Sequence, residues 1–173
     1  LKNDFLLRLS LTKGIGAFGK QRIYQFAKRH QWWQFDGLEI RLLAQSTKPN
    51  NWNEWSGERL KQVERTHQFI TIEDEVYPET LRHVPTPPLV LFYKGDLALL
   101  KRKMLAVVGA REATNYGYHV LQELMPEITK RGFTIVSGLA KGIDSFAHQF
   151  AISNQGKTIG VVGTGLDICY PKN

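Results

Sequence analysis

The sequence predicts an α/β protein with a Rossmann-like parallel sheet, which a small all-helical domain precedes. After Lys103, short apolar runs alternate with segments of helical spacing, and this alternation requires parallel strands joined by right-handed crossovers. Before residue 72, apolar residues recur at helical spacing, and all four tryptophans lie within the first 55 residues. We therefore predict two domains, a helical one over residues 1–71 and the sheet domain over residues 72–173.

The predicted helical domain contains three helices and one glycine turn. A helix over Leu6–Leu11 ends at Gly14-Ile15-Gly16, a second carries Ile23, and a third lies around Glu58–Gln68. The turn is either a helix-hairpin-helix, whose backbone N–H groups hold a DNA phosphate, or a tight turn that uses glycine for positive φ; we favour the tight turn. The tryptophans are expected in the core or at a protein contact rather than as base-stacking platforms. Whether this domain contacts DNA or a partner protein stays open.

The sheet domain is predicted from apolar runs that end in glycine. A strand over Leu89–Tyr93 follows a proline-rich connection and ends at Gly95. The regular alternation then comprises a strand over 105–108, a helix over 115–130, a strand over 133–136, a helix from Asp144 to near Gly156, and a strand over 158–162. Because residues 105–108 are continuously apolar, we expect this strand to be buried on both faces.

Charge favours an acidic partner for this protein. The 173 residues carry a net charge of +7 and a pI of about 9.6, which points first to nucleic acid. The excess lies in residues 1–72, with 12 Lys/Arg against 6 Asp/Glu, whereas residues 73–173 have 11 against 10. A phosphate site in the second half must therefore depend on a few placed groups rather than on a general basic field.

Membrane, secreted and zinc-binding proteins are disfavoured. No apolar run approaches the roughly 20 residues that cross a bilayer, and the N-terminus lacks the layout of a signal peptide. The single cysteine, Cys169, allows no internal disulfide, and zinc-ligand spacing is absent. We expect a cytoplasmic protein with no metal, no other cofactor and no membrane partner.

The strongest functional signal is a glycine-bearing loop after each strand of the regular alternation. These loops are Gly109-Ala110-Arg111, Ser137 to Gly142 and Gly163 to Asp167, and parallel strands place all three at the same edge of the sheet. Glycines admit an oxyanion close to backbone N–H groups, and the following helices direct their positive ends toward it. The predicted anion-binding residues are Gly109, Arg111, Ser137, Gly138, Lys141, Gly163, Gly165 and Lys172.

Neither a dinucleotide site nor catalysis is indicated at this edge. The fingerprint G-x-G-x-x-G and the Walker A loop are both absent. Asp144 opens a helix and is expected to cap it, and His148 is expected to pack or to pair with Asp144. No nucleophile–base pair or metal-ligand set is visible, so we predict no catalytic residue and no metal site. Lys101-Arg102-Lys103 lies at the opposite edge and is expected to be solvated.

Several motifs together indicate a family resemblance. They are Tyr77-Pro78, Pro87-Pro88, Ala106 to Arg111, Ser137 to Asp144, Ala147-His148, Gly163 to Asp167 and Tyr170 to Asn173. In this order they resemble the DNA-processing protein A family, also called DprA or Smf, strongly over residues 73–173. The preceding helices resemble the family's sterile-alpha-motif-like (SAM-like) domain more loosely.

The resemblance implies a single-stranded DNA-binding protein of natural transformation, which protects incoming DNA and helps to load the RecA recombinase without being an enzyme. It implies phosphate contacts at Arg111, at Lys172 and in the loop Ser137 to Lys141. Family members usually have Ser where Ala110 stands. They also continue beyond the position of Asn173, so we expect the N-terminal part of an extended Rossmann-like domain, without the surface of the family's homodimer.

The alternative is an enzyme that acts on a nucleotide or a phosphoribosyl compound. The lysine-decarboxylase-like phosphoribohydrolases also use loops of a Rossmann-like sheet. Their Pro-Gly-Gly-x-Gly-Thr loop with a nearby Glu is missing from this sequence. The DNA-binding hypothesis is therefore favoured.

Overall fold

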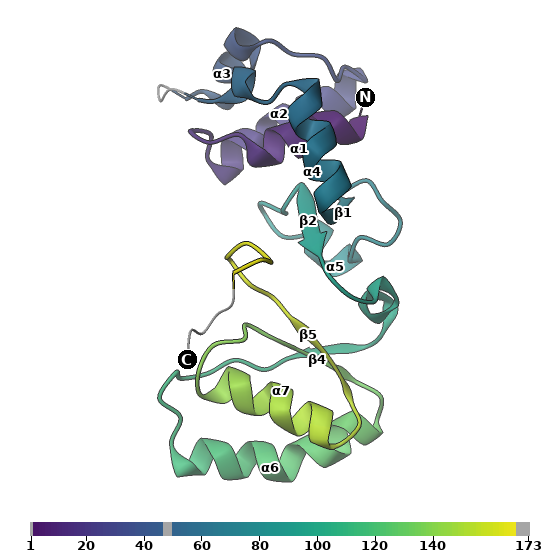
Figure 1. Cartoon of the computed structure of the whole chain (residues 1–173), viewed down its shortest axis with the longest axis vertical. Coiled ribbons are helices and arrows are strands. Elements are labelled where there is room, and N and C mark those ends of the chain that lie inside the picture. Colours follow the sequence, from purple (N-terminus) through teal and green to yellow (C-terminus); the bar gives the residue numbers. More distant parts are fainter. Residues whose placement is uncertain (1, 47–49, 169–173) are drawn as a thin grey trace. The chain divides into compact units, whose positions relative to one another are not determined.

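The computed structural model describes residues 2–46 and 50–168, which belong to two compact units (Figure 1). Unit 1 is Leu1–Lys94 and unit 2 is Gly95–Asn173. The predicted domain boundary lies earlier, between residues 71 and 72. The two divisions differ because the segment after residue 71 pairs back onto unit 1 as a hairpin strand, and the domain assignment itself stays a prediction.

Unit 1 combines helices with a small antiparallel hairpin. Its elements are α1 (Lys2–Leu11), α2 (Ala17–His30), α3 (Gly37–Ala44), the 3₁₀ helix η1 (Trp52–Glu54), α4 (Gly57–Thr66), β1 (Gln68–Thr71), α5 (Glu79–Arg82) and β2 (Val90–Tyr93). In the hairpin, β1 pairs with β2 so that Ile70 faces Leu91. The three predicted helices and the strand over Leu89–Tyr93 are confirmed, whereas α3 and β1 were not predicted.

The core of unit 1 forms around the apolar face of α1. Leu6, Leu7 and Leu9 are fully buried, and the ring of Phe5 meets three further aromatic rings, those of Trp33, Phe35 and Trp52. Trp52 is only 2% exposed, which confirms a core position for this tryptophan, whereas Trp32 is 54% exposed. The tryptophans of unit 1 thus divide between its core and its surface.

The glycine turn between α1 and α2 is a tight structural turn. Gly14 has a φ of 81°, and Ile15 between the two glycines is buried. The backbone N–H of Lys13 donates to Oδ1 of Asn51 at 2.7 Å, and the hydroxyl of Ser46 donates to the carbonyl of Gly14. The turn is thus held by side chains of its own unit, as the favoured interpretation predicts.

Unit 2 is a parallel three-stranded sheet with crossover helices. Its elements are η2 (Leu97–Lys101), β3 (Met104–Ala106), α6 (Asn115–Lys130), β4 (Thr134–Ser137), α7 (Ile143–Ser153) and β5 (Lys157–Gly160). Both pairings are parallel, in the order β3-β4-β5, with Leu105 opposite Ile135 and Ile135 opposite Thr158. The predicted alternation of strands and helices is confirmed.

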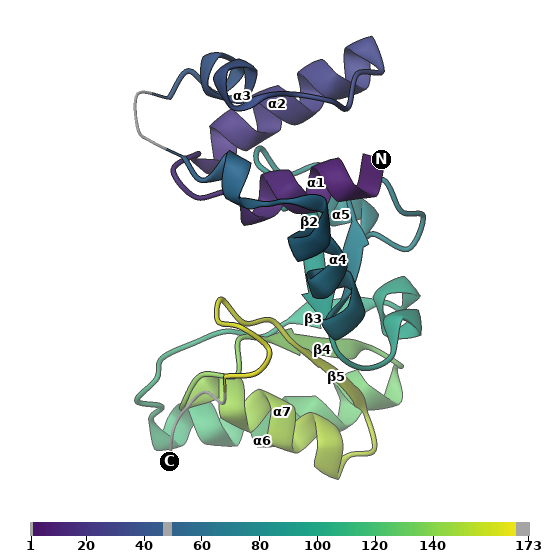
Figure 2. The same cartoon turned by 45° about the horizontal axis from the view of Figure 1, so that its top comes forward.

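Both helices of unit 2 lie side by side on one face of its sheet (Figure 2). Crossovers of one hand between strands in consecutive order place successive helices on the same side. Their apolar faces form one core with the sheet, made of Leu121, Met125, Ile135, Ala147 and Ala151.

The prediction that the strand over 105–108 is buried on both faces is wrong. Leu105 is 36% exposed, Val108 is 75% exposed, and Val161 beyond β5 is 60% exposed. The reason is topological: within the described part of unit 2, both helices take the same face, so the other face of the sheet has no helical layer. A continuous apolar run does not reveal which elements will cover it.

Candidate functional site

Three loops meet at the carboxyl edge of the parallel sheet. We call residues 107–113 after β3 the first loop, residues 138–142 after β4 the second loop, and residues 161–168 after β5 the third loop. The backbone N–H of Ile143, the residue of α7 that directly follows the second loop, donates to the carbonyl of Ala110 in the first loop at 3.1 Å. The N–H of Val161, at the start of the third, donates to the carbonyl of Ser137 at 2.8 Å. The loops are therefore joined in a row, as parallel strands require.

The junction between the first and second loops depends on Gly142. Its φ is 78° and its ψ is −128°, a conformation that side chains other than glycine's rarely tolerate. A Cβ at this position would also press on the carbonyl oxygen of Ala110 and lie 2.5 Å from that of Arg111. The backbone of the first loop thus rests directly on Gly142, which fixes the point where the Arg111 side chain begins.

Arg111 and Lys141 are the two predicted cations that the structure places on adjacent loops. Both side chains are exposed, and neither forms an ion pair or a hydrogen bond with another residue of the described ranges 2–46 and 50–168. Guanidinium and ammonium groups in this condition are free to meet an incoming oxyanion. Their assignment as ligands stays a prediction, and Lys172, the third predicted cation, lies outside the described residues.

The predicted glycines differ in their surroundings. A Cβ at Gly109 would lie 2.7 Å from the side chain of Ile143, so this glycine permits close packing of α7 against the first loop. Gly163 faces open space, because a Cβ there would have no atom within 4 Å, and Gly165 lies against the carboxylate of Asp167. Among these three glycines, Gly163 therefore leaves its backbone most open to a ligand, and the ligand contacts remain predictions.

Ser137 and two amides of the second loop are engaged inside the protein. The Ser137 hydroxyl is buried and donates to the carbonyl of Val107 at 2.6 Å. The N–H groups of Gly138 and Ala140 donate to one carboxylate oxygen of Asp144, at 3.1 and 3.4 Å. An internal carboxylate thus occupies the position that an external oxyanion was expected to take at these two amides, and it fixes the shape of the loop.

The expectation that Asp144 caps its helix is wrong. The N-cap of α7 is Gly142, without a side-chain hydrogen bond, and Asp144 lies within the first turn. Its carboxylate, 7% exposed, reaches back to the second loop instead. The six-residue separation of Gly138 from Asp144 hides this contact from a capping rule, which looks only two or three residues ahead.

His148 is a packed residue of α7. It is buried, and its Nδ1 lies 2.5 Å from the hydroxyl of Thr158 on β5, so its hydrogen-bond partner is Thr158 rather than Asp144. Burial lowers the pKa of His148, against the opposing effect of the nearby Asp144 charge. The ring is packed between helix and strand, so the packing half of the prediction is confirmed.

The backbone conformation of Leu139 in the second loop was not predicted from the sequence. Its φ is 57°, in the left-handed region that a branched apolar residue seldom adopts. Its side chain covers the end of β5, where a Cβ at Gly160 would lie 2.6 Å from it. Strain of this kind costs on the order of 1–3 kcal/mol and concentrates at functional loops. No local signal for it exists beyond the neighbouring glycines.

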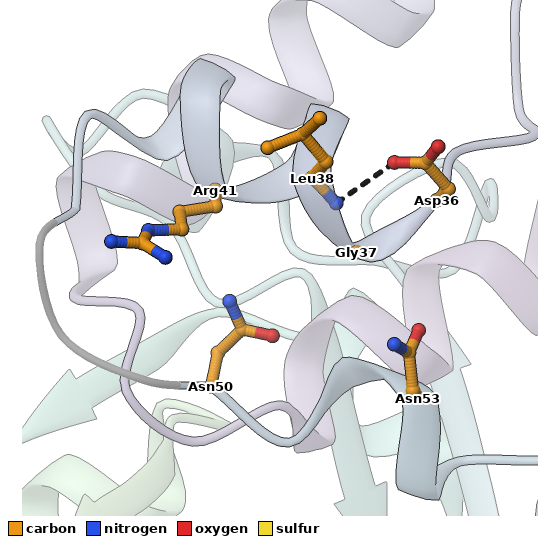
Figure 3. A pocket seen from close by; sticks show the side chains of 6 residues that line it. All are labelled: Asp36, Gly37, Leu38, Arg41, Asn50 and Asn53. Atoms are coloured by element: carbon orange, nitrogen blue, oxygen red, sulfur yellow. Dashed lines mark hydrogen bonds between the residues drawn. The ribbon is translucent and has the colours of Figure 1, made fainter.

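Unit 1 has a surface hollow of about 610 Å³ at the start of α3 (Figure 3). It is lined by Asp36, Gly37, Leu38, Arg41, Asn50 and Asn53. The Asp36 carboxylate accepts hydrogen bonds from the N–H groups of Leu38 and Glu39, and Asn50 accepts one from the N–H of Trp52. These acceptors therefore serve the starts of α3 and η1, and they indicate a structural rather than a chemical role for the hollow.

Two further findings limit the possible chemistry. Within residues 2–46 and 50–168, no three His, Cys, Asp or Glu side chains gather in a way that could hold a metal ion. In the same ranges, no helix is both long and apolar enough to span a bilayer.

Fold and loops together define a Rossmann-like α/β protein whose sheet edge carries glycine-rich loops and exposed cations but no dinucleotide fingerprint. The chain belongs to the family described as DNA recombination-mediator protein A, whose sequence model matches residues 68–173. The family resemblance indicated by the motifs is confirmed.

Curated relatives match about 60% of the chain. DNA processing protein DprA of Streptococcus pneumoniae is 47% identical over 103 residues, which are 60% of this chain and 36% of that protein. DprA of Bacillus subtilis is 44% identical over 104 residues, 60% of this chain and 35% of that protein. The chain thus matches about a third of the length of these curated relatives.

Solved structures extend the similarity to the helices. The X-ray structure of Streptococcus pneumoniae DprA matches with a TM-score of 0.81 and 31% identity, over 97% of this chain and 59% of that one. A structure of DNA processing protein A from Helicobacter pylori, described for its single-stranded DNA binding mode, matches with a TM-score of 0.52 and 34% identity, over 60% of this chain and 46% of that one. The predicted fold class is confirmed, including its helical part.

Proposed function

We propose that this chain binds single-stranded DNA through phosphate contacts at the carboxyl edge of its parallel sheet and takes part in natural transformation as a non-enzymatic recombination mediator. The observation that carries the proposal is the pair Arg111 and Lys141. Both are exposed and have no ion-pair partner in the described part of the chain. They lie on two loops that pack against each other where Gly142 meets the backbone of Ala110 and Arg111. The Helicobacter pylori relative, described for its single-stranded DNA binding, supports the choice of ligand.

The charge balance of residues 73–173 favours phosphate binding through a few local contacts. Residues 73–173 carry almost as many acidic as basic side chains, so a long-range basic field is weak there. Two cations on neighbouring loops can still bind consecutive phosphates, because charge-assisted hydrogen bonds act at contact distance. We extend this assignment to Gly163, Gly165 and Lys172 as further phosphate contacts. Gly109, Ser137 and Gly138 are proposed to belong to the same interface by shaping its loops, because their groups are engaged inside the protein.

Family membership supports three further parts of the proposal. The protein protects incoming DNA, helps to load the RecA recombinase onto it, and works as a homodimer. These roles belong to the whole protein and are proposed for it by resemblance. A cytoplasmic location is proposed from the sequence composition.

A salt titration of oligonucleotide binding tests the proposal. Each phosphate neutralised on a single strand contributes about −0.7 to the slope of log K against log salt. Arg111→Ala and Lys141→Ala are each expected to weaken binding and to flatten the slope by about 0.7. Single strands are expected to bind more tightly than duplexes of the same sequence, as measured by fluorescence anisotropy.

Lys157→Ala is the matched control. Lys157 is also an exposed cation, but it begins β5 and therefore lies at the opposite edge of the sheet. Its substitution is expected to leave both affinity and slope unchanged. Unchanged affinity in Arg111→Ala and Lys141→Ala, or turnover of nucleoside monophosphates by the chain, would contradict the proposal.

A further inference from the structure

Tyr116 is an aromatic side chain that does not pack into the core of unit 2. It lies in the first turn of α6, two residues after the N-cap Thr114 and five residues after Arg111. It is 79% exposed, the highest exposure among the large apolar and aromatic side chains of the described residues. Within residues 2–46 and 50–168, its ring meets no other aromatic ring and its hydroxyl has no hydrogen-bond partner.

The inward position of this helical turn is taken by the next residue, Gly117. A Cβ at Gly117 would lie 2.8 Å from Cδ1 of Ile143, the first residue of α7. The same Ile143 fills the space beside Gly109 in the first loop. The starts of α6 and α7 are thus packed as closely as glycine allows, and no room remains for the Tyr116 ring between them.

The other tyrosine of this turn shows what a structural ring does here. The Tyr118 ring packs edge-on against Phe146, with ring centroids 5.0 Å apart, and in a tilted arrangement against Phe150, with centroids 5.2 Å apart. Both phenylalanines lie on α7. Tyr118 therefore ties α6 to α7 through aromatic contacts. Among the described residues Tyr116 makes no such contact, and its ring stands exposed at the helix end that adjoins the loop of Arg111.

An exposed ring in the helical turn that follows the loop of a proposed phosphate-binding cation matches the chemistry of single-stranded nucleic acid. Proteins that bind single strands combine cations along the backbone with aromatic rings on which bases stack. Stacking also adds affinity that does not depend on net charge.

We propose that Tyr116 is a base-stacking residue, on which a base of the strand stacks while Arg111 holds an adjoining phosphate. This inference rests on the proposed function, and it adds a contact to the base where the proposed function has contacts to the phosphates only. Stacking tolerates every base, so the ring raises affinity without selecting a sequence.

The test compares two single-stranded oligonucleotides of equal length, one with all its bases and one with a central run of abasic sites. The full chain, Tyr116→Ala and Tyr116→Phe are titrated with each. Tyr116→Ala is expected to bind the base-bearing strand about 5- to 100-fold more weakly, the effect of one lost stack. Tyr116→Phe keeps the ring and is expected to bind as the wild type does. On the abasic strand the three proteins are expected to agree.

The salt slope and a helix control separate this inference from the proposed function. Tyr116→Ala is expected to keep the wild-type slope, because no phosphate contact is lost. Leu124→Ala, which removes another exposed apolar side chain from the same helix, is expected to change nothing. Wild-type binding of Tyr116→Ala to the base-bearing strand, or an equal loss on both strands, would overturn the inference alone. No binding by the wild type would remove the proposed function and this inference with it.

Discussion

In unit 1 several basic side chains are bound into the fold, whereas in unit 2 the two cations at the sheet edge are left exposed. Arg8 donates two hydrogen bonds to the carbonyl of Trp52, Lys20 donates to the carbonyl of Ser10, and Lys28 pairs with Glu73 at 2.9 Å. Arg111 and Lys141 have no such partners among the described residues. Counted by unit, Lys and Arg exceed Asp and Glu by 14 to 10 in unit 1 and by 9 to 6 in unit 2. The net charges of the two units are therefore nearly equal, and they do not identify the unit with available cations.

Each unit also contains one carboxylate that is largely shielded from solvent, and the two carboxylates bind different kinds of group. Glu73 in unit 1 gathers side-chain cations, since it pairs with Lys2 at 2.5 Å and with Lys28 and accepts a hydrogen bond from Tyr24. Asp144 in unit 2 gathers backbone amides of a loop. The first stabilises helices of its unit, and the second shapes a loop whose cation stays exposed.

The largest expected effect follows from Gly142→Ala. The new Cβ would meet the carbonyl groups of Ala110 and Arg111, and the backbone would hold an alanine at a φ of 78°. We expect unit 2 to lose on the order of 3 kcal/mol of its free energy of unfolding. Far-UV circular dichroism in denaturant measures the loss, while tryptophan fluorescence stays unchanged because all four tryptophans belong to unit 1.

Gly163→Ala is the control for that prediction. Gly163 also lies in a loop of the sheet edge, but a Cβ there would meet no atom within 4 Å. Its substitution is expected to leave stability almost unchanged. Equal stability of the two variants would show that the contact between the first and second loops is not what holds this edge together.

Elements with strong local signals were predictable from the sequence. The predicted helix over 115–130 has the same bounds in the structure, because Thr114 caps its start and Gly132 follows its end with a φ of 78°. α3 was missed although Asp36 and Glu39 form a capping box, a signal that is readable in the sequence. β1 was missed because its identity depends on pairing with β2, about twenty residues further along.

The candidate site was predictable only in outline. Parallel topology places Arg111 and Lys141 at one edge from sequence alone, since strand order is all that the inference needs. Which groups are free is decided by tertiary contacts: the Ser137 hydroxyl is taken by Val107, and the loop amides are taken by Asp144. The left-handed conformation of Leu139 likewise follows from its packing over Gly160 rather than from its own preference.

Asp144→Ala distinguishes the effect of loop geometry on DNA affinity from the effect of charge. Asp144→Ala removes the acceptor of two loop N–H groups, which is expected to cost about 1–3 kcal/mol and to loosen the second loop. Charge alone predicts tighter DNA binding, because a negative group near the site is lost. We expect weaker binding, as Lys141 loses its fixed position. Anisotropy with the single-stranded oligonucleotide decides between the two outcomes.

Asp144→Asn and Asp167→Ala separate the loss of charge from the loss of the hydrogen-bond acceptor. Asparagine keeps an oxygen acceptor without the charge, so its affinity is expected to lie between those of the wild type and Asp144→Ala. Asp167 is an exposed carboxylate of the third loop, and its removal deletes the same charge without disturbing the second loop. Tighter binding by all three variants would show that charge, rather than loop shape, controls the affinity.

The smallest expected effect lies in unit 1 and appears as a pH dependence. Burial alone would raise the pKa of Glu73, but hydrogen bonds from Lys2, Tyr24 and Lys28 outweigh it and lower the pKa to about 2. Because this pKa is depressed in the folded state, Glu73 stabilises unit 1 above pH 4.5, its ordinary pKa, and loses this effect as the pH falls toward 2. We expect Glu73→Gln to cost on the order of 1–2 kcal/mol at neutral pH.

Tryptophan fluorescence in denaturant measures this difference, since it follows unit 1 alone. The gap in free energy of unfolding between wild type and Glu73→Gln should be largest near pH 7 and should narrow as the pH falls from 4.5 toward 2. Glu79→Gln serves as the control: Glu79 pairs with Arg82 at 3.2 Å but is 69% exposed, so its loss is expected to cost well under about 1 kcal/mol. A gap that stayed constant with pH would mean that Glu73 contributes packing rather than charge, and that its ion pairs with Lys2 and Lys28 do not stabilise unit 1.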